Sequence, residues 1–202
     1  MPPKPKFTRE EIVAAALDIV RERGLKGLTA RDLGARLGAS ARPIFTVFEN
    51  MEDLTREVYA AATARMGAYA DRTSKYAPES KRMGMQMAIF AREEPKLFQL
   101  LLMRENENIT SSDVLFENLG PDSAKCIQAM QQCYDLDIDS ARALFEQVWI
   151  FTYGVSALCA TGMCRFSDDE LSEMLTREFT GALAQIRAAI KPSGGNQNAA
   201  DH

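Results

Sequence analysis

The 202-residue sequence predicts an all-α fold of about nine helices. Apolar residues recur at helical spacing in most segments, and no stretch has the alternating β-branched pattern of a strand. The eight prolines cluster mostly at the N-terminus and at the starts of expected helices, where a missing backbone N–H costs least. These observations favour a chain that is built from helices and divided by caps and prolines.

The first expected helix covers residues 7–24. Thr8 and Glu11 have the spacing of a capping box, and apolar residues then repeat at helical spacing. Gly24 ends this helix, and a short connection leads to Thr29, the expected N-cap of the second helix.

Residues 29–48 have the pattern of a complete helix-turn-helix. Gly34 occupies the place where the two helices approach closely, and Gly38 occupies the turn, where a positive φ is needed. We expect Ser40 to cap the second short helix, whose exposed face would lie in a DNA major groove. The positions that pack the two helices together are apolar: Leu33, Leu37, Ile44 and Val47.

Caps and prolines also delimit the later helices. Asn50 opens the first of them, Asp139 is the expected cap of the fifth, and Ser167 that of the last. The expected ranges are 51–75, 79–92, 96–103, 121–134, 140–163 and 168–190.

The chain is expected to divide into two domains. Residues 1–50 would form a DNA-binding domain, with a disordered basic tail at 1–6. Residues 51–190 would form a ligand-sensing and dimerisation domain, in which 105–120 is a loop with room for a helical turn. Residues 191–202 are expected to be a disordered tail.

Charge is unevenly distributed along the sequence. Residues 1–50 carry nine Lys and Arg against six Asp and Glu, whereas residues 51–202 carry fifteen against twenty-two. A basic head on an acidic body suits a protein that presents one end to phosphates.

Several other classes of protein are disfavoured. No apolar leader is present at the N-terminus, and the longest apolar stretch, 148–160, is too short to span a bilayer, so we expect a cytoplasmic protein without membrane contact. The one histidine is His202, which leaves no histidine-based catalytic triad or usual zinc site. No glycine-rich phosphate loop is present. We therefore expect no enzyme, no cofactor and no metal site.

The four cysteines lack C-x-x-C spacing, and in a reducing compartment they are expected to be buried thiols. Cys126 and Cys133 are seven positions apart and would share a helical face, which leaves thiol sensing open. The other two are Cys159 and Cys164.

Residues 7–59 resemble the DNA-binding domain of the TetR family of bacterial transcriptional regulators. The first helix has T-x-x-x-I-x-x-A-A from Thr8, and the connection has G-x-x-x-L-T from Gly24. The second helix of the motif ends in two aromatic residues, Phe45 and Phe48. The rest of the chain is similar to the family only in length and helical character. The resemblance implies a dimeric regulator that responds to a ligand.

The candidate partner of the head is a double-stranded DNA operator. Arg42 is the best candidate for a base contact, because arginine binds guanine through two hydrogen bonds. Hydroxyl groups and helix N-termini would contact phosphates, although plain helix capping explains Thr29, Ser40 and Asn50 equally well. The predicted DNA-binding residues are Thr29, Arg31, Ser40, Arg42, Pro43, Phe45, Thr46 and Asn50.

The head departs from the family pattern at two positions. The family commonly has a tyrosine at Phe45 and a lysine at Met51, and both would contact phosphates. Their loss predicts weaker non-specific DNA binding. The alternative function is therefore a helical ligand-binding or protein-interaction module with a weakened DNA-binding head.

Large, flexible side chains are frequent between residues 81 and 163, and methionine adapts to varied ligand shapes. Ordinary core packing is the alternative for each of them. The resemblance implies that a pocket for a small hydrophobic ligand lies among the middle helices. The predicted lining residues are Phe90, Phe98, Met130, Trp149 and Tyr153.

The last two expected helices, 140–163 and 168–190, are apolar over more than one face, which favours a subunit interface over a monomeric core. The resemblance implies a homodimer that joins these helices in a four-helix bundle. The predicted interface residues are Phe179, Leu183 and Ile186. The helix at 51–75 is expected to connect the head to the pocket and to tilt when a ligand binds.

Overall fold

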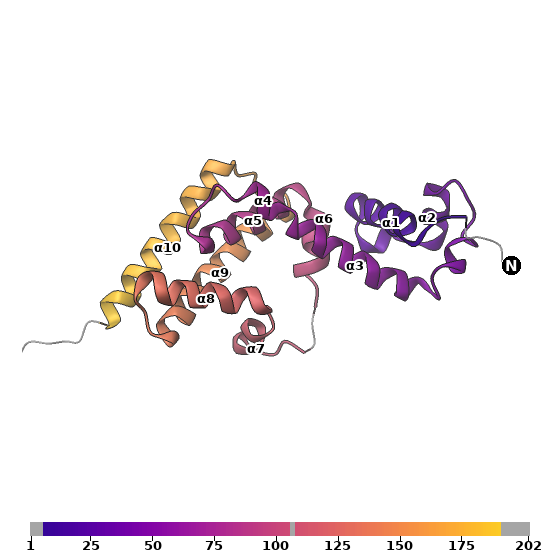
Figure 1. The fold of residues 1–202 in the computed structure, drawn as a ribbon. Helices are drawn as coiled ribbons and strands as arrows, with labels where there is room; N and C mark the ends of the chain where they lie inside the picture. Colours follow the sequence, from indigo (N-terminus) through magenta and orange to yellow (C-terminus); the bar gives the residue numbers. More distant parts are fainter. Residues whose placement is uncertain (1–5, 106–107, 191–202) are drawn as a thin grey trace, which may run out of the picture.

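The computed structural model describes residues 6–105 and 108–190, and every regular element within these ranges is a helix (Figure 1). The predicted all-α fold is confirmed. The described residues form ten α-helices and two short 3₁₀ helices, close to the expected count of about nine. The expected tails at 1–5 and 191–202, with His202, lie outside the described residues.

The head occupies one end of the molecule in Figure 1 and consists of four short elements and the start of a fifth. The predicted capping box is confirmed: the Glu11 backbone N–H donates to Thr8 Oγ1 at 3.2 Å, and the Thr8 N–H donates to Glu11 Oε2 at 2.8 Å. The elements are α1 (Arg9–Arg23), η1 (Leu25–Gly27), α2 (Ala30–Arg36), η2 (Ile44–Thr46) and α3 (Met51–Gly67).

Two glycines shape the turn of the motif, as predicted. Gly38 has a φ of 63°, a conformation that glycine adopts without strain. A Cβ atom at Gly34 would lie 2.8 Å from the carbonyl carbon of Ser40 and 2.9 Å from the Ala41 nitrogen. Backbone atoms occupy that space, so a larger residue at Gly34 would force the two halves of the motif apart.

The second half of the motif differs from the prediction. It is one turn of 3₁₀ helix, η2, and the expected side-chain cap from Ser40 is not formed. Pro43 explains the difference, because the residue before a proline is disfavoured in the α conformation, and Arg42 is at that position. The N–H groups of Ile44 and Val47 instead bond three residues back, at 3.1 Å each.

The body contains the remaining helices, and their ends agree closely with the capping signals. Two details differ. The expected helix at 51–75 is interrupted at Ala68, next to Gly67, a residue type that weakens helices. The cap of the fifth expected helix is Asp137 rather than Asp139, because Asp137 Oδ1 accepts the Ser140 N–H at 2.8 Å. The helices are α4 (Tyr69–Arg72), α5 (Glu79–Glu93), α6 (Pro95–Leu102), α7 (Ser112–Glu117), α8 (Pro121–Tyr134), α9 (Ile138–Ala160) and α10 (Asp168–Ile190).

Helices α5 and α9 form the centre of the body, and α8 and α10 pack against them. Among the described residues, α9 is the one helix long and apolar enough to cross a membrane, by length and composition alone. The apolar stretch at 148–160 covers only the second half of α9. The sequence therefore did not indicate a helix of membrane-spanning length. The contacts of α9 with α5, α6, α8 and α10 are those of a core helix.

The core continues from the head into the body. Phe48, Leu54 and Val58 are buried in the head, and α6 packs on both α1 and α3. The head is therefore joined to the body by two helices, α3 and α6, rather than by a single linker.

Candidate DNA interface and effector cavity

The predicted DNA-binding residues lie at the start of α2, along the turn and η2, and at the start of α3. Seven of the eight are exposed, and Pro43 is half-buried. Phe45 is an exposed aromatic residue, with 46% of its surface accessible. An exposed aromatic ring on this turn can make apolar contact with a thymine methyl group.

Arg31 and Arg42 differ from the other arginines of the head. Arg9 pairs with Glu57 at 2.9 Å, Arg23 pairs with Asp32 at 3.6 Å, and Arg36 pairs with Glu22. Within the described ranges, Arg31 and Arg42 have no ion-pair partner. These two side chains can therefore bind DNA without first breaking a contact in the protein.

The predicted phosphate contacts of two hydroxyl groups compete with contacts inside the head. Thr29 Oγ1 donates to Asp32 Oδ2 at 2.6 Å, and Thr46 Oγ1 donates to the Pro43 carbonyl at 2.6 Å. The expected caps are confirmed, since Thr29 and Asn50 accept the N–H groups of Asp32 and Asp53 at 3.1 and 2.8 Å. The remaining N–H groups at these helix starts are better placed to meet phosphates than the threonine hydroxyls are.

A cavity of about 580 Å³ lies in the body between α3 and α4 on one side and α5, α8 and α9 on the other. Its walls are mostly apolar and rich in methionine. The residues that line it include Met66, Gly67, Ala70, Glu79, Ser80, Arg82, Met83, Gly84, Gln86, Met87, Leu102, Leu119, Asp122, Ser123, Lys125, Cys126, Met130, Phe145, Val148, Trp149 and Thr152.

Of the five predicted lining residues, Met130 and Trp149 lie in this wall. Tyr153 lies behind it, stacked on Trp149 with 5.3 Å between ring centroids, and its hydroxyl donates to the Leu102 carbonyl at 3.0 Å. Phe90 and Phe98 are fully buried in the core: Phe90 packs edge-on against Tyr69, and Phe98 packs against Tyr153.

Most of the cavity wall that α5 supplies was not among the predicted lining residues. Ser80, Met83, Gly84 and Met87 recur every three or four residues, so they share one face of α5 and point into the cavity. That spacing could have been found in the sequence. Which face of α5 borders a cavity depends on how the helix packs.

The charged groups of the cavity are paired. Arg82 pairs with Glu79 and holds the pKa of that carboxyl below its usual value, and Lys125 pairs with Asp122 at 3.1 Å. Burial raises the pKa of the Cys126 thiol to about 11, so this thiol is neutral near pH 7. Cys133 is exposed, and the two cysteines therefore do not share the same surroundings. The cavity walls suit a ligand without net charge.

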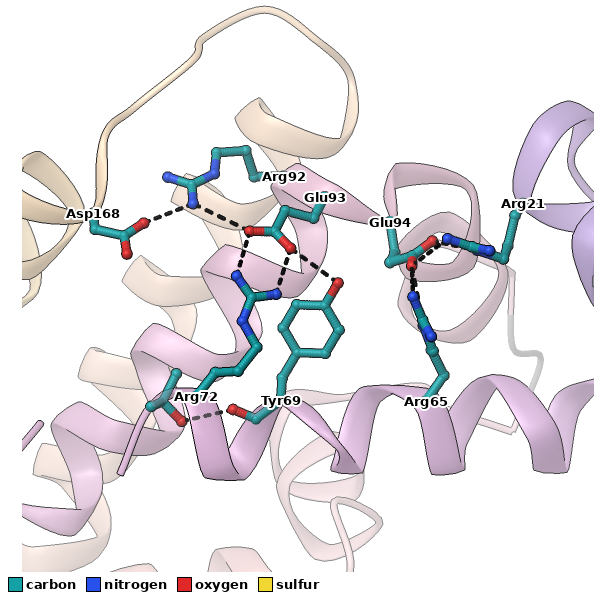
Figure 2. A network of polar contacts seen from close by, with 9 residues as sticks. Arg21, Arg65, Tyr69, Arg72, Arg92, Glu93, Glu94 and Asp168 are labelled. Carbon is teal, nitrogen blue, oxygen red and sulfur yellow. Dashed lines mark hydrogen bonds and ion pairs between the residues drawn. The ribbon is translucent and has the colours of Figure 1, made fainter. Parts of the chain in front are cut away.

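Glu94 joins the head to the body at the α5–α6 junction (Figure 2). Its carboxylate is 5% exposed and accepts hydrogen bonds at 2.8 Å from Arg21 of α1 and from Arg65 of α3. Burial alone would raise the pKa of Glu94, but the hydrogen bonds from both arginines outweigh it and leave the pKa below its usual value. A single carboxylate thus fixes the head, the connecting helix and the body together.

Glu93 points the opposite way in Figure 2 and fastens parts of the body. It accepts a hydrogen bond from the Tyr69 hydroxyl at 3.1 Å and from Arg72 Nη2 at 2.9 Å. Its neighbour Arg92 donates to Asp168 at 2.6 Å, at the start of α10. The C-terminal end of α5 therefore binds the head through Glu94, and it binds α4 and α10 of the body through Glu93 and Arg92.

The predicted dimer-interface residues contact their own chain. Leu183 is 9% exposed, and Phe179 and Ile186 pack against the same cluster as α8 and α9. The ring of Phe179 lies 5.1 Å from that of Tyr134. The exposed apolar side chains of α9 and α10 include Ile150, with 56% of its surface accessible, and also Ile138 and Ile190, nearer the helix ends.

The head has the architecture of a helix-turn-helix DNA-binding domain, with Gly34 and Gly38 at the turn and two surface arginines that have no ion-pair partner in the described part of the chain. Residues 12–58 match the family model described as bacterial regulatory proteins, tetR family. The family that the motifs of the head predicted is confirmed over these residues.

Solved structures show the same fold over most of the chain. A protein assigned to the TetR-family transcriptional regulators of Mesorhizobium loti is 19% identical, with a TM-score of 0.54, over 88% of this chain and 95% of that one. A TetR-family protein of Vibrio parahaemolyticus is 21% identical, with a TM-score of 0.51, over 86% and 97%. The fatty acid degradation regulator of Bacillus halodurans is 17% identical, with a TM-score of 0.55, over 93% and 99%. No curated protein matched the chain.

Proposed function

We propose that this protein is a DNA-binding transcriptional regulator that a small hydrophobic effector releases from its operator, as a repressor would be. The observation that carries the proposal is the path of α3. This helix begins beside Asn50, a predicted DNA contact, packs under the head through Leu54 and Val58, and ends at the cavity wall with Met66 and Gly67. A molecule in the cavity would touch the helix on which the head rests.

A second connection reinforces this path. Gln86 of α5 donates to the Met66 carbonyl at 3.0 Å, so the two helices are fastened at the cavity. Helix α5 then continues to Glu94, which holds Arg21 and Arg65. An effector shifts an equilibrium only if it binds two arrangements unequally. We propose that a filled cavity displaces α3 and α5 together and so changes the position of the head.

The proposed protein is a homodimer, because one helix-turn-helix makes few base contacts whereas two related by a twofold axis bind two half-sites. The exposed face of α9 and α10 supports this interface. Ile150 is exposed there, and a Cβ atom at Gly154 or Gly181 would meet no other atom within 4 Å. We propose these residues, rather than Leu183, as the centre of the interface.

The proposed assignment of parts is that residues 1–50 bind DNA and residues 51–190 bind the effector and form the dimer. We place the protein in the cytoplasm, where its operator is. We propose that the cavity binds a ligand and does not catalyse a reaction, because its charged groups are paired and its thiol is neutral.

One observation favours the alternative, a ligand-binding or protein-interaction module with a weakened head. Thr46 already donates its hydroxyl to Pro43, and Phe45 has no hydroxyl to donate, so the η2 turn offers few groups for phosphates. The two functions differ in their dependence on salt, since phosphate contacts release counterions.

Fluorescence anisotropy tests the proposal. The full-length protein is titrated into a labelled duplex from the promoter beside its own gene and into a scrambled duplex, between 50 and 200 mM salt. We expect a tighter complex on the promoter, in which both affinities fall as salt rises. Equal, salt-independent binding to the two duplexes would support the alternative.

A further inference from the structure

A second, smaller cavity of about 270 Å³ lies between the first half of α5, the end of α8 and the middle of α9 and α10. We call it the side cavity, and the larger one the effector cavity. Side chains in contact at Gly84 separate the two: a Cβ atom at Gly84 would lie 3.1 Å from Leu175 Cδ1 and 3.6 Å from Thr152 Cγ2. The side cavity is therefore a separate space with its own walls.

The walls of the side cavity are mostly apolar. Val148 of α9 and Leu175, Phe179 and Leu183 of α10 border it. Tyr134, at the end of α8, also lines it, and its ring centroid lies 5.1 Å from that of Phe179. A dry cavity of about 150 Å³ holds a benzene ring. The side cavity therefore has room for one substituted ring or a body of similar size.

Lys81 of α5 is the one charged residue among the described residues that line the side cavity. Its Nζ atom lies 6.0 Å from the ring centroid of Tyr76, and Lys75 Nζ lies 5.0 Å from the same centroid. Within residues 6–105 and 108–190, neither lysine forms an ion pair. Two cations therefore share one aromatic ring beside the cavity, and no described carboxylate pairs with either of them.

The first turn of α5 adds to this positive charge. Pro78, Ser80 and Lys81 all line the side cavity, and Pro78 gives the helix no side-chain cap. The free N–H groups at the start of a helix carry partial positive charge. Glu79, the acid of this turn, is paired with Arg82. An apolar space bordered by uncompensated positive charge suits a ligand that has an apolar body and one negative group.

We propose that the side cavity binds a small organic anion with one carboxylate and a compact apolar body, such as an aromatic monocarboxylate. The carboxylate pairs with Lys81, and the ring packs against Leu175 and Phe179 of α10. This second site goes beyond the proposed function, because it differs from the effector cavity both in its place and in the charge of its ligand.

Calorimetric titration of the full-length protein with benzoate and with benzamide tests the role of charge. Benzamide has nearly the same shape but no charge, so benzoate should bind more tightly at the same ionic strength. Lys81→Met removes the charge from a half-buried position. It should weaken benzoate binding roughly 3- to 10-fold and leave benzamide binding unchanged. Lys75→Met is the matched control: Lys75 lies over the same Tyr76 ring but does not line the cavity, and its loss should change benzoate affinity less.

Two further variants test where benzoate binds. Thr176→Phe fills the side cavity from an exposed position of α10 and should abolish benzoate binding. Met83→Trp narrows the effector cavity, which Met83 lines, and leaves the side cavity open, so benzoate should bind as it does to the wild-type protein. Melting curves followed by circular dichroism check that each variant is folded. Thr180→Phe, exposed on the same wall, replaces Thr176→Phe if that variant is not folded.

Three results would overturn the proposed site: no benzoate binding to the wild-type protein, equal affinities for benzoate and benzamide, or equal losses in Lys81→Met and Lys75→Met. Loss of benzoate binding in Met83→Trp but not in Thr176→Phe would also overturn it, because benzoate would then occupy the effector cavity. None of these results affects binding to the promoter duplex, which tests the proposed function by itself.

Discussion

Arg21 and Glu94 form a two-point ion pair across the head–body boundary, although they are 73 positions apart in the sequence. Both contacts are 2.8 Å long, and Arg65 of α3 shares the same carboxylate. The position of the head relative to the cavity therefore depends on the buried carboxylate of Glu94.

Glu94→Gln should loosen the head without unfolding it. The amide has nearly the same shape, but it leaves two arginines without their charged partner, at a cost of about 1–3 kcal/mol in the free energy of unfolding. We expect a smaller effect of effector on operator affinity, because the α5 connection to the head is weakened. Urea unfolding and anisotropy measure the two effects. Glu93→Gln is the control, since Glu93 holds Tyr69 and Arg72 within the body; an equal loss of coupling in both variants would contradict the special role of Glu94.

The same carboxylate predicts a dependence of stability on pH. The pKa of Glu94 is lower in the folded protein than the usual 4.5, so its contribution is fully present above that value. It is lost as the pH falls from about 4.5 through the lower pKa of the folded state. Urea unfolding between pH 7 and pH 3 should therefore show a smaller acid-induced loss in Glu94→Gln than in the wild-type protein. Parallel curves would show that other carboxylates account for the acid sensitivity.

Arg42→Ala should reduce both operator affinity and sequence preference. Arg42 has no ion-pair partner in the described part of the chain, so its loss removes a DNA contact and no contact within the protein. The expected cost is about 1–3 kcal/mol on the operator, measured by anisotropy. Arg36→Ala is the matched control, since Arg36 pairs with Glu22, and it should change affinity little. If Arg42→Ala weakened binding equally on scrambled DNA, Arg42 would contact only the phosphate backbone.

Met51→Lys should restore a phosphate contact that the head lacks. The proposed dimer has two heads and would gain two contacts, which are expected to steepen the slope of log affinity against log salt by about 1.8 and to tighten binding at low salt. Gln132→Lys, exposed on α8 in the body, adds the same charge away from the head. The two slopes are compared in parallel salt titrations. Equal slopes would mean that the start of α3 does not reach a phosphate.

Ile150→Glu should dissociate the proposed dimer and leave each chain folded. Ile150 is 56% exposed, whereas Leu183 is 9% exposed within one chain. A charge at Leu183 would therefore disrupt the core of the chain itself. Light scattering should give a monomer for Ile150→Glu, with a normal circular dichroism spectrum and weak operator binding. A wild-type protein that is already monomeric would end the dimer proposal.

Most helix ends could be predicted because caps act over three or four residues. Thr8, Thr29, Asn50 and Ser167 cap the helices that the sequence assigned to them. The turn of the DNA-binding motif is also local, since Gly38 supplies the positive φ. The predicted helix after Ser40 was wrong, because Pro43 disfavours the α conformation of the preceding residue and the segment forms the 3₁₀ helix η2 instead.

The sequence by itself determined the helical class, the capped helix ends and the family of the head, because each depends on residues close together in the chain. Only the tertiary structure decided which large side chains border a cavity and which fill the core, as the different places of Trp149 and Phe90 show. It also decided that Glu94 would bind Arg21 and Arg65. Burial and ion pairing depend on which faces of distant helices meet, and helical periodicity gives the faces of each helix but not their partners.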